Sequence, residues 1–424
     1  MAKLGDIFKT TSGSTPLSSN KSFYDNGTIS WLTSGEVSQG KISYTKKFIT
    51  QKALEKTSVK LLPKHSVVVA MYGATVGEVG ILNIESTTNQ AVCGILPNLG
   101  KANPFYIYYH LLNRKSELIK FASGSARTNI SQKIIQDFEI NLPSLQTQTV
   151  IANILSSLDD KIELNNTINK ELENLAKNIY DYWFVQFDFP GENKRPYKSS
   201  GGKMKFYHEL GREIPADWKI GKISDYVEKY KGGDWGKEAI IGNYTEKVHC
   251  IRGTDFPSLT GVGNINAPIR YILPKNTAKK LDIGDLIIEI SGGSPTQSTG
   301  RICYINQRIL SRFDSDIITS NFCKAITLQD SNALYFLYLY WVKLYENGHF
   351  FNFEGKTTGI KNFLFDIFVS THFIPKVPYD LLKSFDLQVA PLFNKIQQNL
   401  QESEYLAKTR DFLLPMLMSG QISV

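Results

Sequence analysis

An internal repeat limits the chain to folds in which one structural unit occurs twice. Four pairs of segments match in the same order: 66–73 with 285–292, 87–90 with 319–322, 124–130 with 355–360, and 142–143 with 374–375. The second and fourth pairs share an offset, since 321 − 89 = 232 and 375 − 143 = 232, and the third differs by one residue, since 355 − 124 = 231. The first pair consists of β-branched runs that end at a glycine, which is typical of a strand and a turn. Four matches in one order predict two similar globular domains.

A long helical segment ends each half. Apolar residues recur every seven positions in both segments, with one asparagine at the third place of each series: Ile151, Leu158, Asn165, Leu172 and Ile179, then Phe385, Leu392, Asn399, Leu406 and Leu413. Sustained heptads predict helices that pair with another helix in a coiled-coil-like seam.

The two series superpose at 399 − 165 = 234, so Asn165 and Asn399 occupy equivalent positions. Because a buried asparagine needs a polar partner, we interpret Asn165 and Asn399 as a pair that sets the register of the two helices. A tolerated polar residue in each seam is the alternative. Pro391 either kinks the second helix or marks its first turn, since proline cannot donate a hydrogen bond to the preceding turn.

The polar, Pro/Gly-rich segment 190–202 separates the two halves and predicts a linker. The sequence therefore predicts an α+β chain with two globular mixed α/β domains, two long antiparallel helices and a pseudo-twofold internal repeat. The expected parts are a first domain at 1–143, a central helix at 144–186, a linker at 187–205, a second domain at 206–377 and a C-terminal helix at 378–424. A helix of about 36 residues is roughly 54 Å long, which would separate the domains by one to two turns of duplex DNA.

The composition favours a polyanionic partner. Forty-eight Lys and Arg oppose 40 Asp and Glu, which gives a net charge of +8, although many basic proteins bind no nucleic acid. The N-terminus lacks the apolar core of a signal peptide, and the aromatic-rich stretch 334–342 is too short to span a bilayer, so a buried helix is predicted there. Cys93, Cys250, Cys303 and Cys323 are scattered, which indicates neither a disulfide framework nor a zinc site. We expect a cytoplasmic protein with reduced thiols and no membrane partner.

Four segments resemble the specificity subunits of type I restriction–modification systems. Residues 406–422 are similar to the terminal signature LRDxLLPKLxSGEI, 180–188 to SWFVDF, 213–223 to IPEGWEVGKLGD, and 72–77 to RYGATIGKV. The matches follow one another in the family's order along nearly the whole chain. Thr409 and Met416 depart from the terminal signature, and the loop 291–300 is longer than its counterpart in the first half.

The resemblance implies a non-catalytic specificity subunit of a type I restriction enzyme and methyltransferase complex. Each domain would be a target recognition domain that reads one half of a bipartite double-stranded DNA target. The helices would set the spacer and dock two modification (methyltransferase) subunits, and restriction (motor-nuclease) subunits would complete the complex. The chain would direct adenine methylation and restriction by these partners. S-adenosylmethionine, and ATP and Mg for restriction, are expected in the partner subunits, with no cofactor or metal bound by this chain.

Sequence elements that could support catalysis are incomplete. Residues 103–106 resemble the (N/D/S)-P-P-(F/Y/W) loop of amino-methyltransferases, but the second proline is missing, and a turn before a helix is the alternative. Residues 354–356 fit a nuclease Glu-x-Lys without a Pro-Asp strand. The chain has no G-x-x-x-x-G-K-[ST] phosphate loop, and its histidines lack metal-ligand spacing. A self-sufficient methyltransferase or nuclease, which would act on DNA unaided, remains one alternative. A stand-alone DNA-binding or scaffold protein, which would leave the heptad seam without partners, is another.

Base reading requires polar side chains on loops that reach a groove. The candidates in the first domain are Tyr72, Thr75, Ser125, Arg127, Thr128 and Asn129. Those in the second domain are Lys231, Trp235, Arg252, Ser294, Thr296, Gln297, Lys356, Thr357 and Lys361. The loops 231–235 and 291–300 are the strongest candidates, because their polarity serves no obvious packing need. These loops differ between the halves, as two different half-sites would require.

Overall fold

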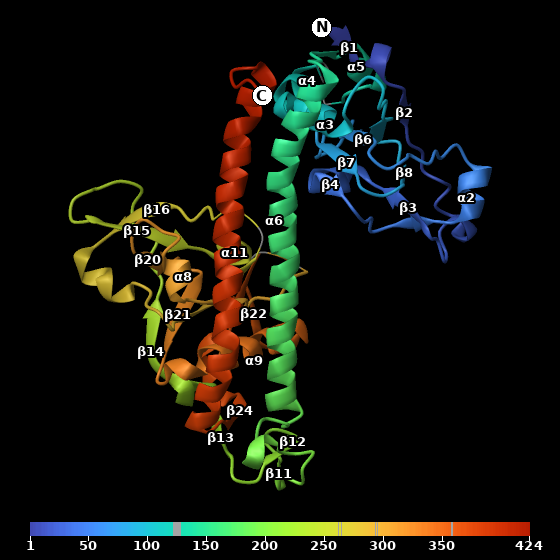
Figure 1. Cartoon of the computed structure of the whole chain (residues 1–424). Coiled ribbons are helices and arrows are strands. Elements are labelled where there is room, and N and C mark those ends of the chain that lie inside the picture. Colours follow the sequence, from blue (N-terminus) through green and yellow to red (C-terminus); the bar gives the residue numbers. More distant parts are fainter. Residues whose placement is uncertain (122–128, 262, 264, 293, 295, 358) are drawn as a thin grey trace. The chain divides into compact units, whose positions relative to one another are not determined.

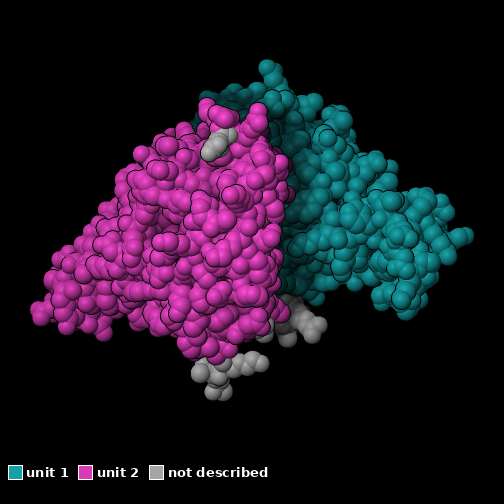
Figure 2. Space-filling model, turned by 90° about the horizontal axis from the view of Figure 1, so that it is seen from below, with its two compact units in different colours: residues 1–161, 406–424 teal, residues 162–405 magenta. Residues whose placement is uncertain are grey.

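Runs of β-branched and aliphatic residues form the central strands of both halves. The structure, a computed structural model, describes residues 1–424 except 122–128, 262, 264, 293, 295 and 358, and it does not describe the side chains of Glu192, Lys356 and Thr357. The chain divides into unit 1, residues 1–161 with 406–424, and unit 2, residues 162–405 (Figure 2).

Unit 1 is built on two sheets. The larger has the order β2 (Thr10–Ser12), β9 (Val92–Ile95), β6 (Val67–Ala70), β7 (Val79–Leu82) and β4 (Lys41–Ile42). The smaller has the order β5 (Phe48–Ile49), β3 (Ile29–Leu32) and β8 (Thr87–Thr88), and β1 (Ala2–Lys3) pairs with β10 (Glu139–Ile140). The helices are α1 (Leu4–Ile7), α2 (Gln51–Lys56), α3 (Pro104–Asn113), α4 (Lys115–Lys120) and α5 (Gln132–Asp137).

Unit 2 repeats this plan with additions. One sheet has the order β14 (Val227–Gly232), β21 (Cys323–Leu328), β17 (Leu286–Glu289) and β19 (Ile302–Tyr304), and another has the order β16 (Ile269–Ile272), β15 (Glu246–Ile251) and β20 (Ile317–Thr319). β13 (Lys219–Lys222) pairs with β24 (Phe373–Lys376), β11 (Met204–Tyr207) with β12 (Arg212–Pro215), and β23 (Ile360–Phe363) with both β18 (Ser291–Gly292) and β22 (Glu354–Thr357). The helices are α7 (Phe256–Thr260), α8 (Gln307–Leu310), α9 (Leu334–Glu346) and α10 (Phe365–Thr371).

The strand pairings confirm the predicted duplication. The order β2–β9–β6–β7 in unit 1 corresponds to β14–β21–β17–β19 in unit 2, and β5–β3–β8 corresponds to β16–β15–β20. In each of the smaller sheets the last pair is parallel, β3 with β8 and β15 with β20, and the others are antiparallel. The pairing of β1 with β10 likewise corresponds to that of β13 with β24.

The backbone hydrogen bonds fix the register of the repeat. The Ala70 amide donates to the Glu78 carbonyl as the Glu289 amide donates to that of Arg301, so the match of 66–73 with 285–292 is in register, since 289 − 70 = 219 and 285 − 66 = 219. Two predicted offsets are wrong. The Asn89 amide donates to the carbonyl of Leu32 at the end of β3, and the Ser320 amide donates to the carbonyl of Ile251 at the end of β15. Asn89 and Ser320 are therefore equivalent, and 320 − 89 = 231.

The other wrong offset concerns β10 and β24. The Leu4 amide donates to the Phe138 carbonyl as the Ile223 amide donates to that of His372, and 372 − 138 = 234, not 232. Dipeptide similarity did not fix strand register, because a slip of one or two residues still leaves apolar residues in line. Part of the match between 124–130 and 355–360 lies outside the described residues.

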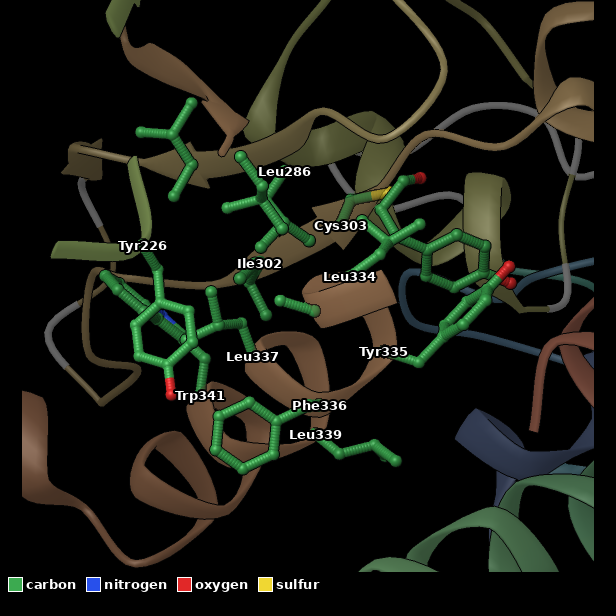
Figure 3. Packing of buried hydrophobic residues seen from close by; sticks show 14 of the residues in the cluster. Tyr226, Leu286, Ile302, Cys303, Leu334, Tyr335, Phe336, Leu337, Leu339 and Trp341 are labelled. Carbon is green, nitrogen blue, oxygen red and sulfur yellow. The ribbon is translucent and has the colours of Figure 1, made fainter. Parts of the chain in front are cut away.

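The apolar segment 334–342 forms most of α9 and is buried, as predicted. Figure 3 shows Leu334 and Leu337 of α9 on the side of Ile302 and Leu286 of the sheet, within the main core cluster of unit 2. α9 therefore covers one face of the sheet whose strand ends carry the candidate site. In the part of the chain that the structure describes, no helix has the length and apolarity needed to cross a membrane.

The two long helices run antiparallel, as predicted. α6 spans Leu145–Tyr180 and continues as a π-helical turn, Asp181–Val185, and α11 spans Tyr379–Ser419. In unit 2, Asn165 of α6 contacts α11 at 399–403, and the Tyr180 ring further along α6 lies 6.3 Å from that of Phe385, which is earlier in α11. Figure 1 shows the helices side by side. Pro391 is exposed in the interior of α11, so it does not mark a first turn.

In unit 1, the end of α11 packs against the start of α6. The Asp159 carboxylate accepts from Arg410 Nη1 at 2.7 Å and from the Tyr109 hydroxyl, so one residue of α6 joins α11 to α3. Leu414 and Leu417 are buried in the same core cluster as Ile151, Ala152 and Leu155 of α6. The last residues of the chain therefore complete the core of the first domain.

Asn165 and Asn399 lie together between the helices of unit 2, and both are buried. Asn165 Nδ2 donates to Glu402 Oε2 at 2.9 Å and to the Asn399 carbonyl at 3.4 Å. Asn399 Nδ2 donates to Asn169 Oδ1 at 2.8 Å, so the two predicted residues do not pair amide to amide. The three buried asparagines are joined by Glu402 and Ser403 at the edge of this polar layer, and its role in register stays a prediction.

The segment 187–205, predicted to be a linker, packs on unit 2. Phe187 and Phe189 are buried, and the Phe189 ring stacks on Trp218 at 5.4 Å and on Tyr197 at 4.8 Å. The polar residues of this segment suggested a free linker, whereas its few aromatic residues attach it to the core.

Candidate functional site

A pocket of about 810 Å³ lies at the strand ends of unit 2. Its walls come from the turn after β15, the end of β17, the loop 291–301 and the residues just before β21. Trp235, Arg252, Ser294 and Gln297, all predicted from the sequence as DNA-contacting residues, line this pocket. The structure therefore brings four predicted residues together from three separate loops. Their contact with DNA stays a prediction.

Two arginines in the pocket are held by buried carboxylates. Arg301 donates from Nε to Glu289 Oε2 at 2.8 Å and from Nη2 to Oε1 at 2.6 Å. Arg252 donates from Nε and Nη2 to the two oxygens of Asp255 at 3.0 and 2.9 Å. The hydrogen bonds to Glu289 and Asp255 raise the pKa of the respective arginines, so both guanidinium groups are fixed cations. Such groups can bind phosphate or the acceptor edge of a base.

Aromatic side chains add flat surfaces to the pocket. Trp235 is partly exposed, and the Arg270 guanidinium lies 4.2 Å from its ring centroid. Arg270 is in turn bonded to Glu238 at 2.8 Å. Phe322, which also lines the pocket, is more than half exposed. Exposed aromatic rings beside cations are typical of surfaces that contact nucleic acids.

The base of the loop 291–300 is anchored to the core. Glu354 accepts from the Thr299 amide at 2.8 Å, and the Trp341 indole donates to the Gly300 carbonyl at 2.7 Å. Further out, Ser294 Oγ accepts from the Gln297 amide at 3.2 Å. Thr296 and Gln297 are exposed at the tip. The loop thus has a fixed base and accessible polar residues, as the sequence predicted from its length and polarity.

The prediction that Lys231 contacts DNA is wrong. Lys231 lies in β14 and is 4% exposed. Its Nζ donates to Asp282 at 2.6 Å, to Asp285 at 2.7 Å and to the Lys280 carbonyl at 3.0 Å, which uses all three of its donors. The polarity of the segment suggested an exposed loop, but the side chain instead pairs with the buried Asp285 and the exposed Asp282.

Of the other two lysines predicted in unit 2, Lys361 contacts the loop 291–300. Lys361 Nζ lies 3.1 Å from Glu354 Oε2 and donates to the Gln297 carbonyl at 3.4 Å, so it also braces the loop 291–300. It remains partly exposed. The side chains of Lys356 and Thr357 lie outside the described residues.

In unit 1 the structure brings Tyr72 and Asn129 together, since their backbones pair as the counterpart of β18 with β23. Asn129 is exposed and Tyr72 partly so. Thr75 Oγ1 donates to the Ser34 carbonyl at 3.0 Å, which fixes the turn after β6. The predicted residues Ser125, Arg127 and Thr128 lie outside the described residues.

Sequence reasoning missed Arg301 and Glu289. They are twelve residues apart and form no recognisable motif, because their pairing depends on the register of β17 with β19. An alignment of the two halves at the correct offset would place Arg301 opposite Glu78 and Glu289 opposite Ala70. This change of charge at equivalent positions is the signal that could have pointed to the pair.

The residues considered for catalysis have structural roles. Asn103 caps α3, with its Oδ1 accepting from the Phe105 amide at 3.0 Å, which confirms the turn-before-helix interpretation of 103–106. Glu354 is bonded to Thr299 and Lys361. Among the described residues, no group of three His, Cys, Asp or Glu side chains could hold a metal ion. All four cysteines are buried thiols.

Known proteins resemble the chain, one of them over its whole length. The family described as the type I restriction modification DNA specificity domain matches residues 1–174. The type I restriction enzyme MjaIX specificity subunit of Methanocaldococcus jannaschii is 26% identical over 434 residues, which covers 100% of this chain and 93% of that protein. The EcoR124I/EcoR124II specificity subunit of Escherichia coli is 26% identical over 196 residues, which covers 44% of this chain and 48% of that protein.

A solved structure shows the same fold. The crystal structure of the type I restriction–modification system S subunit from M. genitalium has a TM-score of 0.61 and 15% sequence identity to this chain. The superposition covers 98% of this chain and 95% of that one.

Proposed function

The chain belongs to the type I restriction–modification DNA specificity family, and from this we propose that it is the DNA-binding specificity subunit of a type I complex. Each domain reads one half of a bipartite target. The observation that carries this proposal is the duplicated strand topology with different loops at equivalent strand ends. One scaffold used twice with different contact residues is what recognition of two different half-sites requires.

The long helices set the distance between the half-sites and dock the partner subunits. α6 has 36 residues, which gives a rod of about 54 Å. Tyr379, Leu387 and Phe412 on α11 are each more than half exposed, and such apolar side chains support a docking surface for modification subunits. We propose that the complex contains two modification subunits, with restriction subunits added where DNA is also cut.

The chemistry belongs to the partners in this proposal. The modification subunits bind S-adenosylmethionine and methylate adenine, and the restriction subunits use ATP and Mg. The specificity subunit itself transfers no group and selects where the partners act. The specificity subunits named above as relatives support this division of labour.

A domain exchange tests the proposal. Residues 1–143 are replaced by the equivalent domain of another family member, and the methylated sequence is mapped for the complex with modification subunits. One half-site should change, while the other half-site and the spacer stay the same. Changes in both halves would contradict independent reading by the two domains, and methylation by the purified chain alone would contradict a non-catalytic role.

A helix deletion tests the ruler function separately. One helical repeat is removed within 161–172, with a matching cut in α11. The spacer should become shorter and both half-sites should stay the same, because the recognition loops are untouched. Altered half-sites would argue against the ruler function.

A further inference from the structure

We infer that Arg301 reads a guanine in the half-site of the second domain and that Glu289 holds it in the reading position. This inference rests on the proposed DNA-binding function and deepens it, since it assigns one base to one side chain.

The geometry of the Arg301–Glu289 pair leaves a reading edge unused. Arg301 meets the carboxylate with Nε and one proton of Nη2, which is the side of the guanidinium. Within the described residues, neither proton of Nη1 has an acceptor in the protein. Nη1 and the outer proton of Nη2 form two parallel donors at the end of the group. Guanine presents two acceptors, O6 and N7, with the matching spacing in the major groove.

The surroundings keep this arginine in one conformation. Glu289 is buried at the end of β17, and Arg301 is the first residue before β19, so both are attached to paired strands. The arginine side chain is 20% exposed and lines the pocket. A Cβ at Gly253 would lie 2.3 Å from Glu289 Oε1 and 3.1 Å from Arg301 Nη2, so the glycine leaves the room that the ion pair occupies. A side chain fixed before binding loses little entropy on binding.

Arg252, the arginine predicted from the sequence, lacks this edge. Its Nη2 donates to Asp255 at 2.9 Å and also to the Asn266 carbonyl at 3.0 Å, so both Nη2 protons are used. Only Nη1 is left, and a single nitrogen cannot contact O6 and N7 with two parallel bonds. Arg252 is suited to a phosphate oxygen, which carries no sequence information.

The equivalent positions of the first domain carry different charges. Glu78 and Ala70 take the places of Arg301 and Glu289, because the Ala70 amide donates to the Glu78 carbonyl at 2.9 Å as the Glu289 amide donates to that of Arg301. Glu78 is paired with Lys115 at 2.6 Å. The backbone is kept while a cation is replaced by an anion. A residue that distinguishes two half-sites should differ in this way.

The test uses the complex of the full chain with modification subunits and compares wild type with Arg301→Lys. Lysine keeps the charge but not the two parallel donors. One guanine position in the second half-site should lose about tenfold to hundredfold in discrimination against other bases, since a bidentate contact contributes roughly that much. The other positions, the first half-site and the spacer should not change. Arg308→Lys, an exposed arginine on α8 of the same unit, is the matched control and should change nothing.

A modified base tests the contact atom directly. 7-Deazaguanine at the affected position lacks the N7 acceptor. It should weaken binding of the wild-type complex strongly and binding by Arg301→Lys less, because a lysine ammonium can still donate to O6. If Arg301→Lys does not fold, Glu289→Gln provides the second variant, and a smaller loss at the same guanine is expected because the arginine is held less firmly.

Three results would overturn the assignment. The assignment fails if the variants alter no single guanine position while the wild-type complex reads a split motif, if all positions weaken equally, or if 7-deazaguanine weakens wild type and variant alike. A wild-type complex that reads no split motif would instead contradict the proposed function itself, so the two failures are distinguishable.

Discussion

The first domain depends on the last residues of the chain, and Leu417→Ala should therefore destabilise that domain. Leu417 is 3% exposed and shares the core cluster of unit 1 with Ile151 and Leu155, more than 260 positions earlier. Arg410, nearby on α11, adds an ion pair with Asp159. These contacts close the first domain with a segment that follows the whole second domain in sequence.

The magnitude follows from the lost packing. Leucine-to-alanine changes in a core cost about 2–5 kcal/mol. Leu417 lies two residues before the end of α11, where the last turn can relax into the cavity, so a cost near the lower limit, about 2.5 kcal/mol, is expected. At about 1.4 kcal/mol for each factor of ten, the population of the opened first domain should rise roughly sixtyfold.

Amide hydrogen exchange measured by mass spectrometry reads each domain separately. Peptides from strands β6 and β9 of the first domain should lose protection in Leu417→Ala, and peptides from β17 and β21 of the second should not. Phe412→Ala on the same helix is the control, since Phe412 is 64% exposed and its removal should change stability by less than about 0.5 kcal/mol. Equal loss in both domains, or no loss in the first, would refute this account of how α11 ends.

Three further changes act within unit 2. Asn165→Ala should lower the unfolding free energy by about 2 kcal/mol in urea denaturation, because it loses a hydrogen bond to a carboxylate. Asn165→Leu should be nearly neutral, because the apolar area that leucine buries offsets that loss. Equal losses in the two variants would contradict this explanation. Lys231→Met should cost about 3 kcal/mol in thermal denaturation by leaving the buried Asp285 unpaired, without altering the target sequence. Burial, with the nearby charge of Asp330, raises the pKa of Asp386 to about 6, so this acid favours folding below about pH 4 and that contribution is lost as the pH rises through 6. Asp386→Asn should therefore stabilise the chain by about 1 kcal/mol at pH 8 and not at pH 4, and an equal effect at both pH values would exclude this cause.

The large features of the fold could be predicted because their patterns are long. Two heptad series of five positions each predicted the long helices, their likeness within one chain predicted the antiparallel pairing, and repeated segments predicted two domains. Strand register was harder, because matches of two to four residues tolerate a shift. The offsets at 89 and 143 were wrong for that reason.

The candidate site was predicted in outline only. The loops 291–300 and 231–235 were found from their polarity, and Arg252 was found as a polar side chain on a loop. Lys231 shared those features, yet it faces inward, since the direction of a side chain in β14 is set by its pairing with β21. Arg301 was missed because the residue that positions it is distant in sequence.

The most direct test of the account is a genome-wide methylation map of the host with and without this gene. We predict a methylated-adenine motif made of two short half-sites and a fixed spacer, which disappears when the gene is deleted. A map that is identical in both strains, or a lost motif that is short and continuous, would contradict the claim that one duplicated chain selects a split DNA target.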